Sequence, residues 1–372
     1  MRTIEEGDVL AGRYQLRNKL GSGGFSEVWR AIDTTTRGKD IALKIYSPGI
    51  ALDDMGIKLF KREYNIASQL IHSHVVVPNH YDIHEGAPFM VMPFMSNGTS
   101  IKYVSEWNAF EVMRFLKQIA SALHYIHTLR EPVNHKDIKP ENVLVNANGD
   151  FMLADFGISN EFSQTLRKSA VGNSDSAGTL SFIPPEKYSK DLKQRKDRPS
   201  NDIWSLGASV FELITGETPF GNNGGLVQAG GAEIPDINKK LPKYLKGLIT
   251  WMMHIDPNER PTASEVIDTV ENEKLPVSFG AASIALGYST VLVPILAVGL
   301  DFVLCEYLHP IAKLALMITA VLGLLGWMVE VISSKSIAGN YFRFPGLATK
   351  ANWYDWIIPF VTSGLILFNI FL

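Results

Sequence analysis

The stretch His135–Asn142 reads His-Lys-Asp-Ile-Lys-Pro-Glu-Asn, and a second motif, Asp155-Phe156-Gly157, begins thirteen positions after Asn142. The first motif supplies a carboxylate, lysines and an amide, and the second supplies another carboxylate. Hard divalent cations prefer oxygen ligands of these kinds, and a fixed carboxylate can orient an attacking hydroxyl group. The two motifs therefore favour a site that handles phosphate, because phosphoryl transfer depends on charges held around the phosphate.

A glycine-rich segment lies upstream at Leu20–Val28, between two stretches with alternating apolar residues. The alternation predicts two β-strands, and glycines in the turn between them let backbone amides approach phosphate oxygens. Such a turn by itself is equally compatible with an ordinary hairpin. It gains weight only from the motifs that follow it.

Lys44 lies on the next predicted strand, among apolar neighbours, and Glu63 lies on the predicted helix after that. A lysine on a strand is normally solvated, but apolar neighbours would hold this one in an apolar setting, facing a cleft. Glu63 could then pair with its ammonium group. The alternative for Glu63 is an exposed acid, because basic residues precede it directly; we favour the pair.

The composition excludes several classes of protein. The formal net charge is −3, from 35 basic and 38 acidic residues among 372, which argues against nucleic-acid binding as the main activity. The single cysteine, Cys305, excludes a disulfide framework and a cysteine-based zinc site. The length is sufficient for two or three domains.

The order of the predicted elements indicates two lobes. Strand patterns dominate from Tyr14 to Phe94, and helical spacing of apolar residues dominates after Trp107. Strands followed by helices favour an α+β architecture with a ligand cleft between two lobes. Thr262 and Glu265 form a predicted capping box at the start of the last of the predicted helices, which are 59–70, 110–128, 202–215, 243–253 and 262–271.

From about Tyr14 to Glu271 the chain resembles a Hanks-type (eukaryotic-like) serine/threonine protein kinase, because all the motifs above occur in that family's order. The resemblance implies an α+β bilobal domain at 14–272, with a small β-rich N-lobe and a larger helical C-lobe, preceded by a lead at 1–13. It also implies a non-specific serine/threonine protein kinase. ATP would be the phosphate donor, Mg²⁺ or alternatively Mn²⁺ the metal ion, and proteins the substrates.

The resemblance also assigns roles to single residues. Asp137 would orient the substrate hydroxyl group and accept its proton, and Lys139 would offset charge on the γ-phosphate. Asn142 and Asp155 would bind the metal ion. The remaining residues would bind ATP: the pair Lys44 and Glu63; the turn Gly21, Ser22, Gly23, Gly24, Phe25 and Ser26 over the phosphates; and Leu20, Val28, Ala42, Met92, Met95 and Leu144 around the adenine.

Further matches concern support and regulation of the predicted catalytic loop. Glu186 should pair with Arg260, and Asp202 should accept backbone hydrogen bonds from the loop. Lys136 stands where arginine is usual in the family, and lysine cannot form arginine's bidentate fork with a phosphate. Whether activity requires phosphorylation of the segment between Gly157 and Pro184 is therefore open. Autophosphorylation of that segment is a hypothesis, with Ser169, Ser174 or Ser176 as the acceptor.

The chain beyond residue 272 is almost entirely apolar. After Leu275 its charged residues are Lys313, Lys335, Arg343, Lys350, Asp301, Glu306, Glu330 and Asp355. Three segments, 279–300, 312–332 and 355–372, are close to the length that crosses a bilayer, which is about 20 residues. A buried core helix is the alternative for one segment alone, but three in succession predict transmembrane α-helices after a juxtamembrane linker at 273–278.

The loop between the second and third segments carries Lys335, Arg343 and Lys350 and no acid. The positive-inside rule places this loop, and with it the kinase-like domain, in the cytoplasm. We therefore expect a multi-pass membrane protein, in a bacterial cell membrane, whose partners are ATP, protein substrates and the lipid bilayer. No nucleic-acid partner is expected, and a homodimer is left open.

Two alternatives to a membrane-anchored kinase remain at this level. The first is a pseudokinase or scaffold that binds partners without catalysis. The presence of Lys44, Glu63, Asp137, Asn142 and Asp155 counts against it. In the second, the apolar segments form a sensor that controls the kinase instead of a simple anchor.

Overall fold

The computed structural model describes residues 4–22, 26–36, 38–46, 54–104, 107–156 and 180–275. All of these residues except Leu275 belong to one compact unit, Met1–Lys274. The predicted membrane segments lie outside the described residues, as do Gly23, Gly24, Phe25 and the candidate phosphorylation sites of 157–179. Among the helices that the structure does describe, none combines the length and apolar character needed to cross a bilayer.

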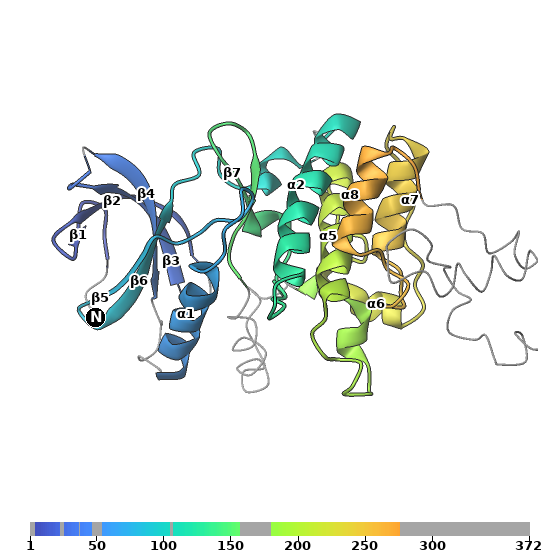
Figure 1. The fold of residues 1–372 in the computed structure, drawn as a ribbon, viewed down its shortest axis with the longest axis horizontal. Helices are drawn as coiled ribbons and strands as arrows, with labels where there is room; N and C mark the ends of the chain where they lie inside the picture. Colours follow the sequence, from blue (N-terminus) through green and yellow to red (C-terminus); the bar gives the residue numbers. More distant parts are fainter. Residues whose placement is uncertain are drawn as a thin grey trace, which may run out of the picture. The chain divides into compact units, whose positions relative to one another are not determined.

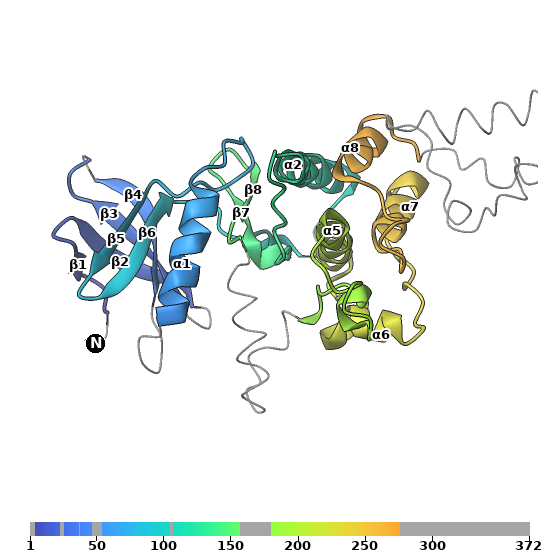
Figure 2. The same cartoon turned by 60° about the horizontal axis from the view of Figure 1, so that its bottom comes forward.

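The N-lobe is built on a six-stranded antiparallel sheet with the strand order β1-β2-β3-β4-β6-β5 (Figure 1). One long helix, α1 (Asp54–Ala67), lies beside this sheet in both views (Figures 1 and 2). The strands are β1 (Val9–Leu10), β2 (Tyr14–Ser22), β3 (Ser26–Asp33), β4 (Lys39–Tyr46), β5 (His80–His84) and β6 (Ala87–Pro93).

The two faces of the sheet carry separate apolar clusters, because successive side chains of a strand point to opposite faces. Leu43 and Ile45 of β4 join one cluster, whereas Ala42 and Tyr46 join the other, to which Phe60 of α1 also belongs. Alternation along β4 therefore places the intervening lysine, residue 44, on the face that α1 covers.

The C-lobe consists mainly of helices. A short hairpin, β7 (Val143–Val145) with β8 (Phe151–Leu153), stands at its boundary with the N-lobe (Figure 1). The helices are α2 (Ala109–His127), α5 (Pro199–Thr215), α6 (Gly225–Ala229), α7 (Lys243–Met252) and α8 (Ala263–Glu271). Short 3₁₀ turns connect them: η1 (Ser100–Tyr103), η2 (Pro140–Asn142), η4 (Pro185–Tyr188) and η5 (Gly221–Asn223).

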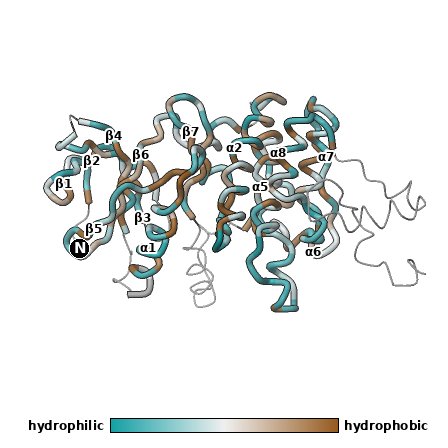
Figure 3. Tube along the Cα trace, in the orientation of Figure 1, coloured by the Kyte–Doolittle hydropathy of each residue, from teal (hydrophilic) through white to brown (hydrophobic). Residues whose placement is uncertain are grey.

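Helix α5 lies at the centre of the C-lobe, with α2, α6 and α7 around it (Figure 2). Its residues from Asn201 to Phe211 are all buried. A Cβ atom added to Gly207 would come within 2.9 Å of Met253, so glycine permits close packing here. The outer helices α2 and α8 instead carry both polar and apolar residues (Figure 3), as expected for helices with one solvated face.

Most predicted helices agree with the observed bounds to within a few residues. The capping box of α8 is confirmed: the Glu265 amide donates to Thr262 Oγ1 at 3.3 Å, and the Thr262 amide donates to Glu265 Oε2 at 2.7 Å. The first predicted helix, 59–70, in fact runs from Asp54 to Ala67. Strands β1, β5, β7 and β8 and helix α6 were not predicted.

Candidate active site

Lys44 connects the two lobes. Its Nζ lies 2.7 Å from Glu63 Oε1 of α1 and 2.9 Å from Asp155 Oδ1, which follows β8. The Lys44 and Glu63 side chains are only 8% and 7% exposed. Burial alone would lower the pKa of Lys44, but the charges of Asp155 and Glu63 outweigh it and raise that pKa, so this ammonium group stays charged. The predicted Lys44–Glu63 pair is therefore present.

Asp155 has a backbone φ of 57°, in the left-handed region that non-glycine residues rarely adopt. Such a conformation persists where surrounding contacts fix it. Here Lys44 binds its carboxylate, and the ring of the next residue, Phe156, lies 4.8 Å from the ring of buried His135. Burial would raise the pKa of Asp155, but the Lys44 charge lowers it and keeps the carboxylate ionised.

The predicted catalytic loop is anchored by the buried carboxylate of Asp202, near the start of α5. Asp202 Oδ2 accepts the His135 amide at 2.8 Å, and Oδ1 accepts the Lys136 amide at 2.9 Å. His127 of α2 donates to Oδ2 at 2.9 Å. Burial would raise the pKa of Asp202, but the His127 hydrogen bond helps to lower it. The expectation that Asp202 holds the loop backbone is confirmed.

Asp137 is held on one side by its neighbours in the loop. Asn142 Nδ2 donates to both the carbonyl oxygen and Oδ2 of Asp137, each at 2.8 Å. Lys139 Nζ lies 2.9 Å from the same Oδ2. With its Oδ2 atom engaged in this way, the Asp137 carboxylate has a fixed direction, which is what a group that orients a substrate hydroxyl requires.

The two residues predicted to bind a metal ion fit a hard divalent cation. Asn142 uses Nδ2 toward Asp137, so Oδ1 is the atom that it can offer to a cation, and Asp155 offers a carboxylate. The Ala154 amide donates to the Asn142 carbonyl at 2.9 Å, which ties the two ligand segments together. Within the described ranges no group of three or more His, Cys, Asp or Glu side chains is arranged to hold a metal ion.

The residues predicted to surround adenine come together only in part. Leu20 is 45% exposed and does not belong to the apolar cluster that contains most of the others. Gly21 and Ser22 pair with β3 opposite Val28 and Glu27, which places the start of the turn beside this cluster. The residues that do share it are Val28, Ala42, Met92, Met95 and Leu144.

A family model for the protein kinase domain matches residues 14–270. The chain belongs to the protein kinase domain family. For a kinase domain, the family implies ATP and a divalent metal ion as ligands, and proteins as substrates. The three segments that carry Lys44, Asp137 and Asp155 all lie within the matched residues.

Two curated relatives illustrate the similarity of this kinase domain. Serine/threonine-protein kinase PrkC of Bacillus subtilis is 29% identical over 70% of this chain and 40% of that protein. CBL-interacting protein kinase 30 of Oryza sativa is 27% identical over 78% of this chain and 60% of that protein. The chain thus spans roughly half the length of these curated relatives.

The fold is also similar to that of a solved kinase domain. The crystal structure of a double mutant of the Mycobacterium tuberculosis PknI kinase domain aligns with a TM-score of 0.55 at 22% identity. The alignment covers 73% of this chain and 99% of that chain. This likeness supports the bilobal fold, with a β-rich N-lobe and a helical C-lobe.

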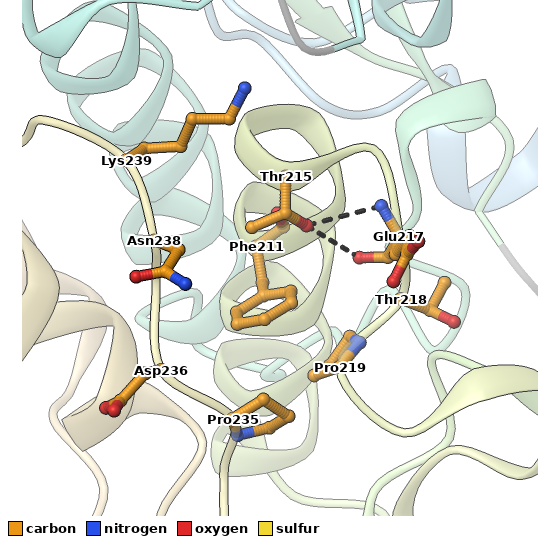
Figure 4. A pocket seen from close by; sticks show the side chains of 9 residues that line it. All are labelled: Phe211, Thr215, Glu217, Thr218, Pro219, Pro235, Asp236, Asn238 and Lys239. Carbon is orange, nitrogen blue, oxygen red and sulfur yellow. Dashed lines mark hydrogen bonds between the residues drawn. The ribbon is translucent and has the colours of Figure 1, made fainter.

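A pocket of about 290 Å³ lies elsewhere in the kinase domain, beside the C-terminal end of α5 (Figure 4). Phe211, Pro219 and Pro235 line it with apolar surface, and Glu217 and Lys239 are among its polar lining residues. None of its lining residues was predicted to bind ATP or a metal ion or to take part in catalysis. The pocket is therefore separate from the candidate active site.

Sequence reasoning missed two polar contacts around the catalytic loop. His127 was given no role from the sequence, yet its ring nitrogen Nε2 binds Asp202 Oδ2. Asp197, in a segment rich in basic residues, contacts both Lys136 and Lys187. Neither contact has a local sequence signal, because both depend on segments that meet only in the folded C-lobe.

Proposed function

We propose that this chain is a serine/threonine protein kinase that transfers the γ-phosphate of ATP to hydroxyl groups of protein substrates. The main support is the convergence of Lys44, Asp137 and Asp155 from three separate segments on one site. Phosphoryl transfer relies on positioning and electrostatic stabilisation, and these groups supply both. A lysine at position 139 resembles the pattern of serine/threonine kinases rather than that of tyrosine kinases, which supports the choice of acceptor.

In this proposal Lys44 binds the α- and β-phosphates, and Glu63 keeps its ammonium group in place. Asp137 Oδ2 is engaged by Asn142 and Lys139, so we assign Oδ1 to the substrate hydroxyl group, whose proton it accepts as the oxygen attacks. Lys139 offsets charge on the phosphoryl group in transfer. Asn142 and Asp155 would hold Mg²⁺, or Mn²⁺ as an alternative, and the bound ion would neutralise charge on the phosphates.

The decisive experiment measures transfer of γ-labelled phosphate from ATP to a generic acceptor protein, followed by phosphoamino-acid analysis. Wild type should produce phosphoserine or phosphothreonine, and Asp137→Ala should reduce the rate at least about 100-fold. Absence of transfer by wild type, or equal transfer by the variant, would falsify the proposal. Phosphotyrosine as the main product would contradict the assignment to serine and threonine.

The same assay separates this proposal from the pseudokinase alternative. A pseudokinase would bind nucleotide without transferring phosphate, and Asp137→Ala would then change nothing. The proposal includes autophosphorylation, with Ser169, Ser174 or Ser176 as candidate acceptors, which mass spectrometry of the wild type after incubation with ATP would identify.

We also propose that the segments 279–300, 312–332 and 355–372 anchor the kinase domain in a membrane. Their apolar composition and the basic loop with Lys335, Arg343 and Lys350 support this proposal and favour a cytoplasmic kinase domain. A sensor role for these segments is the alternative. Removal of the segments separates the two roles, because loss of an anchor leaves kcat nearly unchanged whereas loss of a sensor changes it.

A further inference from the structure

A carboxylate outside the predicted site contacts the catalytic loop. Asp197 lies between η4 and α5, and its Oδ2 is 2.9 Å from Nζ of Lys136, the residue before Asp137. Asp197 Oδ1 pairs with Nζ of Lys187, the residue after Glu186. One carboxylate thus joins the catalytic loop to the segment that follows residues 157–179.

Lys136 is restrained through both its backbone and its side chain. Its φ of 71° lies in the left-handed region, and its amide donates to Asp202 Oδ1 at 2.9 Å. Its side chain reaches Asp197, two residues before α5 begins. Because both acids belong to the same short stretch at the start of α5, they hold Lys136 in one orientation, and Asp137 follows it directly.

The charges at this contact favour an ion pair. Burial would raise the pKa of Asp197, but hydrogen bonds from Lys187 and Lys136 outweigh it and lower that pKa. The Lys136 and Lys187 side chains are 23% and 20% exposed and that of Asp197 is 39% exposed, so water screens part of the contact. Lys187 also donates to the Arg195 carbonyl at 2.9 Å, which keeps the segment around Asp197 folded back on η4.

We infer that Asp197 is a positioning residue of this kinase: it supplies the negative charge that holds Lys136, so the catalytic loop is oriented without a phosphate on residues 157–179. The inference rests on the proposed function. The residue type at position 136 agrees with it. A single ammonium group suits one carboxylate oxygen, whereas recognition of a phosphate by a bidentate fork would require arginine.

The test uses the full chain, treated with a protein phosphatase and shown by mass spectrometry to carry no phosphate. Initial rates give kcat and the KM for ATP of wild type, Asp197→Asn and the control Asp191→Asn. Asp191 lies in the same segment, where its exposed carboxylate accepts the Lys193 amide at 2.9 Å. Asp191→Asn thus removes one negative charge from the segment but leaves the ion pair between Lys136 and Asp197 intact.

We expect unmodified wild type to be active and Asp197→Asn to lower kcat about tenfold, with the KM for ATP and the kcat of Asp191→Asn changing less than about twofold. Asp197→Glu should recover part of the loss. If Asp197 acts through Lys136, the double variant Lys136→Gln/Asp197→Asn should be no slower than Lys136→Gln alone. A purely structural role would instead give additive losses.

Equal kcat values for Asp197→Asn and wild type would overturn the inference, as would a wild type that becomes active only after phosphorylation within 157–179. Hydrogen exchange of a peptide covering 134–142 supplies a readout that does not need activity. Exchange should rise in Asp197→Asn and not in Asp191→Asn, and an unchanged rate contradicts the inference. A wild type inactive in every state would refute the proposed function, while the exchange result would still decide the role of Asp197.

Discussion

Asp202 shows how one buried residue can hold a whole loop, here the one that carries Asp137. Its carboxylate accepts hydrogen bonds from two consecutive backbone amides, those of His135 and Lys136, and from the side chain of His127. A buried carboxylate is costly unless such donors satisfy it. With these three donors in place, the charge is compensated and the loop has little freedom to turn Asp137 away from the site.

At the same scale, Lys44→Met should reduce phosphate transfer at least about 100-fold. The substitution keeps the length of the apolar stem but removes the cation between Glu63 and Asp155. The two carboxylates would then repel each other, and the phosphates would lose a positively charged ligand. Steady-state kinetics with ATP and an acceptor protein measure the effect.

The control for this variant is Lys117→Met. Lys117 also forms a 2.7 Å ion pair, with Glu271, but its side chain is 56% exposed, and the pair links α2 to α8. Exposed ion pairs contribute little, so its activity should stay within about twofold of wild type. Similar losses for both lysine variants would show that Lys44 has no special role.

At the scale of elements, α5 combines several tasks. Its first turn presents Asp202 to the catalytic loop, and its last residue is followed by Gly216, whose φ of 88° ends the helix. Between these points it packs closely enough against the C-terminal end of α7 to need Gly207. It also carries Glu212, whose Oε2 is buried without a hydrogen-bond partner in the described part of the chain.

Glu212 should make stability fall as the pH rises. Burial, and then the charge of Glu141, raise its pKa from 4.5 to about 7. A carboxyl group with a raised folded-state pKa binds more protons when folded, so this contribution destabilises the protein progressively between about pH 4.5 and pH 7. We compare the free energy of unfolding of Glu212→Gln with that of wild type at about pH 5 and about pH 8. After allowance for solvent screening, the difference should shift in favour of the variant by about 1 kcal/mol between the two pH values.

Urea unfolding of the two proteins at both pH values measures this difference. Glu141→Gln should show part of the same gain, because it removes the repulsion but not the burial. If Glu212→Gln and wild type lose stability in parallel as the pH rises, then Glu212 does not titrate in this range and the prediction is wrong.

The predictability of an element depended on how much of its stabilisation is local. The capping box of α8 could be predicted because Thr262 and Glu265 are three residues apart and bond to each other. Strands β7 and β8 have three residues each, too few to display an alternating pattern, and their pairing is stabilised by the surrounding C-lobe. Such elements form because tertiary contacts cover them.

At the scale of the whole molecule, the two lobes are joined by contacts between ionised groups. The N-lobe contributes Lys44, and the segment after β8 contributes Asp155. Because the two groups carry opposite charge and meet at 2.9 Å, this ion pair holds the segment with Asp155 against the N-lobe.

Deletion of the chain after Lys274 should leave a folded kinase domain, because the compact unit ends at that residue. We expect the kcat of the shortened chain to stay within about threefold of the full chain, and its fractionation with membranes to be lost. Cell fractionation and the transfer assay test both points. A much larger change in kcat would favour the sensor alternative, and unchanged fractionation would contradict the anchor.

The sequence alone was enough to predict the ordered motifs, the succession of strands and helices, and the pairs Lys44–Glu63 and Glu186–Arg260, which the structure contains. The motifs and the two pairs could be predicted from their resemblance to the kinase family, and the succession of elements from the spacing of apolar residues. The folded chain was needed to show that Asp197 faces Lys136, that His127 binds Asp202, and that Leu20 lies outside the apolar cluster. Those contacts join segments whose spacing in the sequence carries no information about their distance in space, because packing of the C-lobe around α5 brings them together.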